Sequence, residues 1–383
     1  MGSDVIVIGG GAIGLAVARD LAVDQSVVLL ERGTPGQQAS WAAAGMLCPH
    51  GEASDDDALF RLGLSSLGMY RSYVRGLLDE TGVDAEYQDD GTLVLASTDD
   101  EWADLERRSA WQQAAGMDTS LIGPEEVRTR EPRLTLDIHG ALHCPTDHHV
   151  HPRCLLEALR KACVIRGVSI RSGVSADAIL ASKGRVTGVQ SSGRRYDGAS
   201  VVVAAGAWAG QLAGLDPIIR TRPRKGQILA VEMPRSAFRH VIRWRQFYLT
   251  PRRYGTLVVG ATNEDSGFDR SLSVAGIRQL LDAAATMSGQ VGAYSLEEMW
   301  TGLRPETSDG LPAIGPGAID GLFYAIGHYR NGILLTPVTA RIVGDAVRGL
   351  GLDPELSVFS PERFGEPEST AHASGPVPTR ADV

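Results

Sequence analysis

The chain lacks several features, and each absence excludes a class of protein. No run of about twenty apolar residues occurs, which excludes a membrane-spanning helix. Lys and Arg number 37 against 46 Asp and Glu, and no basic stripe is present, so nucleic acid is not an expected partner. The four cysteines show no C-x-x-C spacing, which favours a reduced, cytoplasmic protein. The first motif begins at Asp4, so we expect no signal peptide before it.

The composition that remains is that of a globular protein. Hydrophobic residues make up 43% of the 383 positions and charged residues 22%, with no visible repeat. This length is enough for two domains with sizeable cores.

The first thirty residues predict a nucleotide-binding βαβ unit. Val5 to Ile8 is a short apolar run that indicates a buried strand, and a helix is expected over Ala12 to Ala22. A second apolar run, Val27 to Leu30, ends on Glu31, whose carboxylate can accept hydrogen bonds from an adenosine ribose.

Three glycines between the first strand and the helix form G-x-G-x-x-G. Gly9 permits a tight turn, Gly11 lets backbone approach a pyrophosphate, and Gly14 lets the helix lie close to the strand. The helix N-terminus supplies N–H groups and the positive end of a dipole for the phosphates. This pattern predicts a dinucleotide but leaves FAD, NAD and NADP open.

A small-residue segment follows a loop at Gly33 to Gly36. The run from Ala42 to Gly45 would let a flat ring or a phosphate lie against backbone, and Ser40 could donate to a phosphate oxygen. A tightly packed helix start explains the same run equally well, so both interpretations stay open here.

The rest of the first half alternates helices and strands. The predicted helices cover Leu59 to Leu78, Glu101 to Ala115 and Pro152 to Cys163, and a further helix begins at Gly123-Pro124. The predicted strands cover Gly91 to Ala96, Ala141 to Cys144 and Val168 to Ile170. The helix from Pro152 fits the crossover of a βαβ unit, so the strand after it could rejoin the first sheet. A hairpin over Arg185 to Arg194 then leads into a buried strand, Ser200 to Ala205, and Gly206 at its end suggests close approach to a cofactor.

From Pro223 the pattern predicts a second, sheet-rich domain. Its predicted elements are strands over Gln227 to Val231, Phe247 to Pro251 and Thr256 to Ala261, and a helix over Ser273 to Ala285. Further on, a strand over Leu322 to Ile326 leads through a loop, Gly327 to Gly332, into a helix expected from Ile333 to Arg348. The residues after 364 have the composition of a disordered tail.

A histidine cluster raises the question of a metal. His143, His148, His149 and His151 lie near Asp147, but no E-x-x-H or H-x-x-x-H helical pair occurs among them. A loop entering the next helix explains the cluster, so we expect no metal.

Several longer motifs resemble the D-amino acid oxidase superfamily of FAD enzymes, and more narrowly the glycine oxidases of the thiamine-pathway (ThiO) type. The motifs are GGGAIG at 9–14, SWAAAGML at 40–47, YLTPR at 248–252, LVVGAT at 257–262, WTGLRPETSDGLPAIG at 300–315 and GHYRNGILLTP at 327–337. The last two are the most specific. The resemblance extends to about residue 364 and implies FAD rather than NAD.

The resemblance also implies cofactor residues. Ala12 and Ile13 would take the pyrophosphate, Glu31 the ribose, and Val174 would offer backbone to the adenine. The complete set of expected cofactor residues is Gly9, Gly11, Ala12, Ile13, Gly14, Glu31, Arg32, Ala39, Ser40, Ala44, Gly45, Met46, Val174, Gly206, His328, Tyr329, Arg330, Asn331, Gly332, Ile333 and Leu334. The segment from His328 to Leu334 would wrap the pyrimidine edge of the flavin, where backbone N–H groups stabilise negative charge.

Three residues resemble the family's catalytic set. Arg304 matches an arginine that pairs with the substrate carboxylate, which suits a guanidinium because it offers two parallel donors. Taken alone, Arg304 could equally form a structural salt bridge. Tyr248 matches a tyrosine that assists at the same carboxylate, and Arg330 would lie near the amine, although it could pair structurally instead. Gln246 and Asn263 depart from the family pattern at positions expected in the pocket wall, which puts glycine as the best substrate in question.

These features predict an α/β protein with a discontinuous, Rossmann-like FAD domain of the GR2 type and a second α+β substrate domain on a mostly antiparallel sheet. The expected FAD domain comprises 1–85, 148–218 and 300–364, the substrate domain 86–147 and 219–299, and the tail 365–383. We expect non-covalent FAD, oxidative deamination of glycine, sarcosine or a small D-amino acid, reduction of molecular oxygen to H₂O₂, a link to thiamine biosynthesis, and a homo-oligomer. The alternatives are a D-amino acid or hydroxyproline dehydrogenase with another electron acceptor, and a flavin-binding structural subunit.

Overall fold

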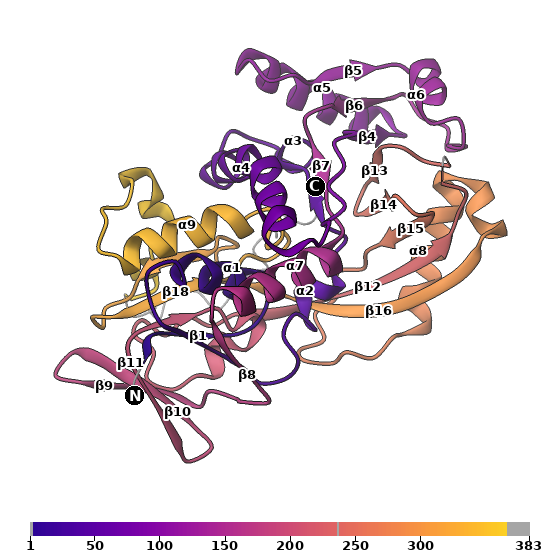
Figure 1. Cartoon of the computed structure of the whole chain (residues 1–383). Coiled ribbons are helices and arrows are strands. Elements are labelled where there is room, and N and C mark those ends of the chain that lie inside the picture. Colours follow the sequence, from indigo (N-terminus) through magenta and orange to yellow (C-terminus); the bar gives the residue numbers. More distant parts are fainter. Residues whose placement is uncertain (1–2, 236, 366–383) are drawn as a thin grey trace, which may run out of the picture.

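The computed structural model describes residues 3–235 and 237–365, and the chain folds there into two eight-stranded sheets (Figure 1). Apart from Gly365, the predicted tail lies outside the described residues. Among the described helices, none combines the length and the apolar character that crossing a bilayer requires.

The first sheet is mainly parallel and contains the predicted nucleotide-binding unit. Its central path runs β17 (Ala313–Pro316), β18 (Leu322–Ile326), β11 (Arg194–Val203), β1 (Ser3–Ile8), β2 (Val27–Glu31) and β8 (Ser169–Ser172), and a hairpin of β9 (Ala178–Ser182) and β10 (Arg185–Ser191) extends from β11. β1 pairs in parallel with both β2 and β11, and β8 rejoins the sheet beside β2 as the sequence predicts.

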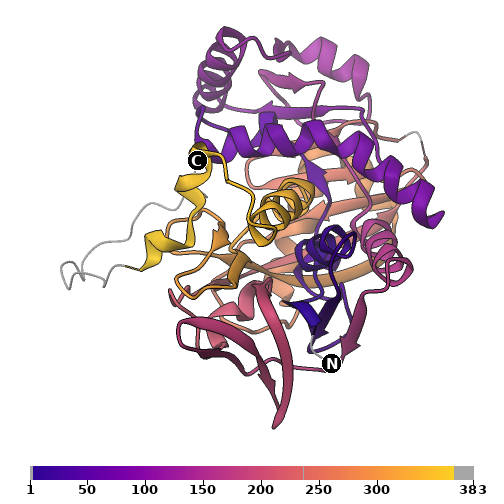
Figure 2. The ribbon, with the colours of Figure 1, turned by 60° about the vertical axis from the view of Figure 1, so that its left-hand side comes forward.

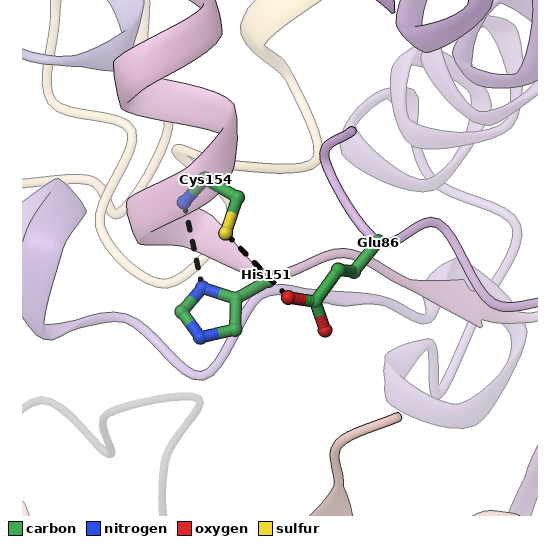
Figure 3. A group of neighbouring side chains, drawn as sticks. All are labelled: Glu86, His151 and Cys154. Atoms are coloured by element: carbon green, nitrogen blue, oxygen red, sulfur yellow. Dashed lines mark hydrogen bonds between the residues drawn. The ribbon is translucent and has the colours of Figure 1, made fainter. Parts of the chain in front are cut away.

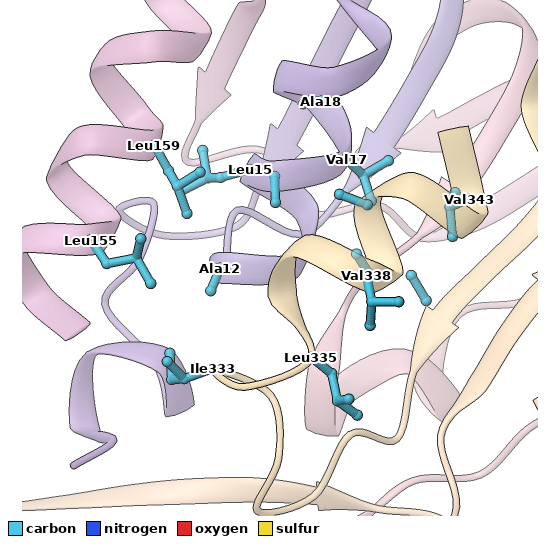
Figure 4. Packing of buried hydrophobic residues seen from close by; sticks show 14 of the residues in the cluster. Ala12, Leu15, Val17, Ala18, Leu155, Leu159, Ile333, Leu335, Val338 and Val343 are labelled. Atoms are coloured by element: carbon cyan, nitrogen blue, oxygen red, sulfur yellow. The ribbon is translucent and has the colours of Figure 1, made fainter. Parts of the chain in front are cut away.

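Helices cover one face of this sheet. They are α1 (Ala12–Leu21), α4 (Ala58–Thr81), α7 (Pro152–Ile165) and α9 (Thr336–Val347). Figure 4 shows side chains of α1, α7 and α9 meeting in one core, among them the fully buried Leu15 and Leu155. Burying a leucine completely contributes roughly 1.5–3 kcal/mol. In the turned view, α1 and α9 lie next to each other although the chain between them exceeds three hundred residues (Figure 2).

The opposite face of the first sheet is also buried. Val5 and Val7 belong to the helix-side core, while Ile6 and Ile8 belong to a second core under the hairpin and Val201. A strand buried on both faces needs apolar residues at every position, which explains why β1 reads as a continuous apolar run.

The second sheet is mostly antiparallel, as predicted. Its order is β16 (Ser295–Glu306), β12 (Arg222–Glu232), β15 (Thr256–Gly260), β14 (Phe247–Pro251), β13 (Val241–Trp244), β4 (Thr92–Ala96), β6 (Gly140–Cys144) and β5 (Ser120–Ile122). The long strands β12 and β16 reach from this sheet toward the first one (Figure 1). A separate apolar core lies between the sheet and α8 (Val274–Met287).

The remaining described elements lie beside or between the two sheets. They are α2 (Ala39–Ala42), β3 (Met46–Leu47), α3 (Pro49–Glu52), α5 (Asp99–Ala114), α6 (Pro124–Arg130), β7 (His148–His149), η1 (Gly206–Gln211), η2 (Gly289–Ala293), η3 (Pro354–Phe359) and η4 (Pro361–Phe364). β3 pairs with β7, and this ribbon joins the small-residue segment to the helix α7.

Two sequence expectations need correction. The helix predicted from Ile333 begins at Thr336, because Pro337 lacks an N–H and its ring clashes with a helical carbonyl four residues before it. A strand that was not predicted, β16, spans the expected domain boundary at 299/300 and pairs with β12 up to Glu306, while the division into domains stays a prediction. The strand was not predicted because it contains Gly302 and Pro305, and both residue types normally weaken a strand pattern.

Candidate active site

One elongated pocket begins at the carboxyl ends of the parallel strands and continues over the second sheet. Its first part is lined by the glycine loop and by Ala204 to Ala207 after β11. Its far part is lined by Tyr248 of β14 and Arg304 of β16. Ligands of open α/β sheets bind at this edge, so the placement agrees with the sequence-based expectation.

The glycine loop has the shape that its spacing predicts. Gly9 has φ +106°, and a Cβ there would lie 2.4 Å from the carbonyl oxygen of Ala204. A Cβ on Gly14 would lie 1.9 Å from the carbonyl oxygen of Gly9. Only glycine allows these contacts, so α1 begins in close contact with β1 and its N-terminus faces the pocket.

Glu31, at the end of β2, holds the glycine loop in place through hydrogen bonds. The Glu31 carboxylate accepts one hydrogen bond from the Gly10 amide and one from the Gly33 amide, each at 2.8 Å. It is nearly buried and lines the pocket. A carboxylate has about four lone-pair sites, so it can still accept hydrogen bonds from a ribose.

The adenosine end contains an aromatic residue that the sequence reasoning did not single out. The Arg32 guanidinium lies 3.5 Å from the ring centroid of Trp208, and both residues line the pocket. Val174 is also there, but its amide donates to the Glu31 backbone carbonyl at 2.9 Å, which leaves only the Val174 carbonyl for a ligand. In the sequence, a large aromatic residue so close to Gly206 could have indicated that Trp208 lines the pocket.

The Ser40 hydroxyl oxygen has a protein partner, and its expected donation to a phosphate stays a prediction. This oxygen accepts a hydrogen bond from the Ala12 amide at 3.0 Å, so α2 covers the first donor of α1. The later amides in the first turn of α1 are therefore the helix donors left for a pyrophosphate.

The small-residue run is open to the pocket and closely packed, and it lies at the end of α2 rather than at a helix start. Residues 42–45 line the pocket, and they are also closely packed: a Cβ on Gly302 would lie 2.6 Å from that of Ala42. The buried Arg252 guanidinium donates to the Ala44 carbonyl at 2.5 Å and to the Val150 carbonyl at 2.7 Å. The second sheet thus holds the backbone of this segment in place.

Arg304 and Tyr248 lie above two glycines of the second sheet. A Cβ on Gly226 would lie 2.5 Å from Nη2 of Arg304, and one on Gly260 would lie 2.1 Å from Cζ of Tyr248. The absence of side chains at Gly226 and Gly260 makes room for these two groups. An isolated glycine inside a strand pattern indicates such close approach, so this signal was present in the sequence.

Arg304 is not part of a structural salt bridge within residues 3–235 and 237–365. Its only hydrogen bond there runs from Nη1 to the Thr262 carbonyl at 3.2 Å, and no carboxylate of that part of the chain lies within ion-pair distance. The remaining guanidinium donors face the pocket. Burial raises the pKa of the Tyr248 phenol, so its hydroxyl stays protonated and able to donate.

The loop after β18 closes the pocket from the side of the first sheet. His328 is buried, and burial lowers its pKa to about 3, so its ring is neutral at physiological pH. Its Nε2 is 3.0 Å from Oγ1 of Thr339. From α4, Tyr70 donates to the Ile333 carbonyl and Ser66 donates to the Leu334 carbonyl.

The pocket contains most of the residues predicted from the sequence. Those on its lining are Arg304, Tyr248, Arg330, Gly9, Gly11, Ala12, Ile13, Glu31, Arg32, Ala39, Ser40, Ala44, Gly45, Met46, Val174, Gly206, His328, Tyr329, Gly332 and Ile333. Segments separated by three hundred residues therefore meet in one site.

Three predicted cofactor residues do not line this pocket. Gly14 acts through close packing, Leu334 belongs to the apolar core, and the Asn331 amide donates to the His328 carbonyl to close a turn. Asn263 does not line it either. Its side-chain oxygen is 3.4 Å from the hydroxyl of Tyr329, which does line the pocket. Asn263 therefore contacts a residue of the pocket wall and is not itself part of that wall.

Glu86, His151 and Cys154 form a small cluster outside the pocket, with one potential ligand atom each within 4.8 Å of the others (Figure 3). The Cys154 amide donates to Nδ1 of His151, which caps α7, and the Cys154 thiol donates to Glu86 at 3.6 Å. Burial, followed by the charges of Arg252 and Arg153, lowers the pKa of His151 to about 4. These nearby guanidiniums disfavour a further cation, and the absence of a resident metal stays a prediction.

Comparison with known proteins identifies the family. Residues 4–346 match the family model described as FAD dependent oxidoreductase (DAO). The chain belongs to this family. It is 34% identical over 363 residues to a glycine oxidase of Geobacillus kaustophilus, covering 93% of this chain and 96% of that protein. The crystal structure of glycine oxidase from that organism superimposes with a TM-score of 0.89 at 33% identity, covering 94% and 98% of the two chains.

A second group of relatives is larger. The chain is 37% identical over 370 residues to the bifunctional protein ThiO/ThiG of Synechocystis, covering 94% of this chain and 54% of that protein. The chain therefore spans about half the length of these bifunctional relatives.

The cofactor of this family is FAD, and the pocket fits it. The glycine cradle and the N-terminus of α1 suit a pyrophosphate, Glu31 suits a ribose, and the small-residue segment leaves room for a flat ring. The chain thus belongs to a family of FAD-dependent oxidoreductases, and its pocket has room for a small molecule between the flavin-sized space and the second sheet.

Proposed function

We propose that this protein oxidises the amine of glycine or a similarly small amino acid. The observation that carries the proposal is the Arg304 guanidinium, which lies over Gly226 with donors facing the pocket and no carboxylate partner in the described chain. A guanidinium of this kind binds a substrate carboxylate through two parallel hydrogen bonds and fixes its orientation. The protonated Tyr248 hydroxyl would donate to the same carboxylate.

FAD, when bound, supplies the two-electron acceptor for the Cα hydrogen of the substrate. The residues of the chain position the substrate and control its charge. Arg304, Arg330 and Arg243 line this end of the pocket against the single carboxylate of Glu52, and their net positive charge disfavours a bound ammonium. The amine would therefore lose its proton on binding, and its lone pair would then assist removal of the Cα hydrogen without a side-chain base.

The proposed products follow from this chemistry. The imine would hydrolyse to a 2-oxo acid and ammonia, and O₂ would take two electrons and two protons to give H₂O₂. The ThiO/ThiG relatives support a further proposal, that the imine supplies thiazole formation in thiamine biosynthesis. Cytoplasmic location and a homo-oligomeric state stay predictions.

The Arg304→Ala variant tests the role of this residue. We expect a fall in kcat/KM for glycine of about a hundredfold, mostly through KM, because a charge-assisted pair is lost while the FAD half of the pocket is untouched. Flavin absorbance of the purified variant checks that FAD stays bound. Arg304→Lys is the matched control and should recover part of the KM, since it keeps the charge but not the paired donors.

Two results would contradict the proposal. An unchanged KM in Arg304→Ala would remove the carboxylate role. Flavin reduction by glycine without H₂O₂ under air would replace the oxidase by a dehydrogenase that uses another electron acceptor.

A further inference from the structure

A second ion pair lies in the wall of the same pocket. Arg243 of β13 donates from Nη1 to Oε1 of Glu52 at 2.6 Å, and both residues line the pocket. In the β13–β14 pair, Arg243 lies directly opposite Tyr248. Directly opposed residues of an antiparallel pair project from the same face, so Arg243 extends into the pocket beside the proposed carboxylate site.

This pair leaves polar groups without partners. Within the described residues, Nε and Nη2 of Arg243 make no hydrogen bond, and neither does Oε2 of Glu52. The side-chain amide of Gln246, on the same wall, also has no protein partner there. None of these atoms is among the fully buried unpartnered side-chain atoms of the described residues, so they are open to the pocket, where a ligand or water can bind them.

The charges at this end of the pocket do not balance. Arg243, Arg304 and Arg330 carry three positive charges, that of Arg330 on an exposed side chain that water screens, and Glu52 carries one negative charge. A substrate with a single carboxylate would leave an excess of one positive charge, whereas a substrate with two carboxylates would neutralise it.

The wall that carries Glu52 is held by buried side chains. The Asp147 carboxylate, which is fully buried, accepts hydrogen bonds from the His50 amide at 3.1 Å and from the Gly51 amide at 2.8 Å. On the other side, Arg108 donates to the Gly51 carbonyl at 2.8 Å. This network fixes α3, and α3 fixes Glu52 and hence the orientation of Arg243.

We propose that the pocket takes small amines with two carboxylates, the first bound by Arg304 and the second by Arg243. The proposal rests on the proposed amine oxidation and specifies its substrate class. Glu52 is a positioning residue that orients Arg243. For iminodiacetate, two electrons and one Cα hydrogen pass to FAD, the nitrogen gives up a proton, and water added to the imine releases glyoxylate and glycine.

Anaerobic flavin reduction by the holoenzyme tests this proposal with matched substrates. Iminodiacetate is compared with sarcosine, and D-aspartate with D-alanine, because each pair differs mainly by the second carboxylate. We expect at least a tenfold higher second-order rate of reduction for the dicarboxylate in one of the pairs. The pair that shows it tells whether the second carboxylate belongs to the nitrogen substituent or to the side chain.

Variants of Arg243 complete the test. In Arg243→Met the preference for the dicarboxylate should disappear, and in Arg243→Lys it should persist in reduced form. If the single variant does not fold, the double variant Glu52→Gln/Arg243→Met, which removes both charges, replaces it in the same measurement. Binding of malonate and acetate, followed by perturbation of the flavin spectrum, gives a readout independent of turnover and should show the same loss of preference.

The outcomes separate this proposal from the proposed function. No preference for the dicarboxylates in the wild-type protein, or an unchanged preference in Arg243→Met, would mean that Arg243 and Glu52 only close the wall. If glycine, sarcosine and the dicarboxylates all fail to reduce the flavin, the proposed amine oxidation itself is wrong.

Discussion

Two regions of this pocket use glycine for the same steric reason and differ in how they are assembled. In the loop after β1, Gly9 and Gly14 leave room for backbone within a stretch of six residues. In the second sheet, Gly226 and Gly260 leave room for the side chains of Arg304 and Tyr248, which come from other strands. The first arrangement is local and recognisable as a motif. The second exists only once the strands pair.

The largest expected effect on FAD binding comes from adding a methyl group within the glycine loop after β1. In Gly14→Ala the new methyl group would lie 1.9 Å from a backbone oxygen, so α1 must move away from β1. We expect loss of bound FAD and a stability loss of about 3 kcal/mol, as for overpacking of a tight contact. Flavin content and thermal unfolding measure both.

A matched glycine substitution provides the control. Gly68 lies within α4, and a Cβ there would meet nothing within 4 Å. Gly68→Ala should keep FAD and gain up to about 1 kcal/mol, because alanine favours helix. Equal loss of FAD in both variants would show that close packing is not what makes Gly14 necessary.

The second largest effect, on the reaction rate, should appear at Gly226 and Arg304, which come from different strands. In Gly226→Ala the methyl group would displace the Arg304 guanidinium, which lies 2.5 Å from that position. A displacement of about 1 Å in a positioning group can cost roughly a hundredfold in rate, so we expect kcat/KM to fall by that order while FAD stays bound. Steady-state kinetics with flavin quantification checks this, and unchanged kinetics would mean that Gly226 does not position Arg304.

The smallest effect concerns pH and the buried His328. Its pKa is lowered to about 3 in the folded protein, whereas an unfolded histidine titrates near 6.5. Between these values the unfolded chain binds the extra proton, so stability falls as pH falls below about 6.5. At pH 5 this amounts to about 2 kcal/mol.

Replacing His328 with Gln isolates that contribution. Gln keeps a group that can hydrogen-bond Thr339 but cannot titrate. Urea unfolding at pH 7 and pH 5 should show a smaller difference between the two pH values in His328→Gln than in the wild type. The same pH difference in both proteins would place the titrating group elsewhere.

The comparison also explains which parts of the site could be predicted. Elements with local signals were predicted closely: β1, α1 and β2 follow from apolar runs and glycine spacing. β16 was missed because Gly302 and Pro305 weaken a strand pattern, although pairing with β12 overrides them. The start of α9 was set three residues too early because the prediction passed over Pro337.

Side-chain partners were harder to predict than elements. Ser40 was expected to donate to a phosphate, which stays a prediction, and the sequence did not reveal that its oxygen also accepts a hydrogen bond from the Ala12 amide. Arg243 was not among the expected site residues. Its place opposite Tyr248 depends on the register of a hairpin, which the residue types alone did not reveal.

The sequence alone determined that a dinucleotide binds at the start of the chain, because the tight turn, the close helix and the terminal acid all depend on residues within thirty positions. The comparison with relatives identified FAD. Only the tertiary structure decided where Arg304 lies, what leaves room for it, and that Arg243 and Glu52 lie in the same pocket. The physical reason is that these contacts join strands far apart in the chain, and side-chain positions there depend on strand pairing rather than on local preference.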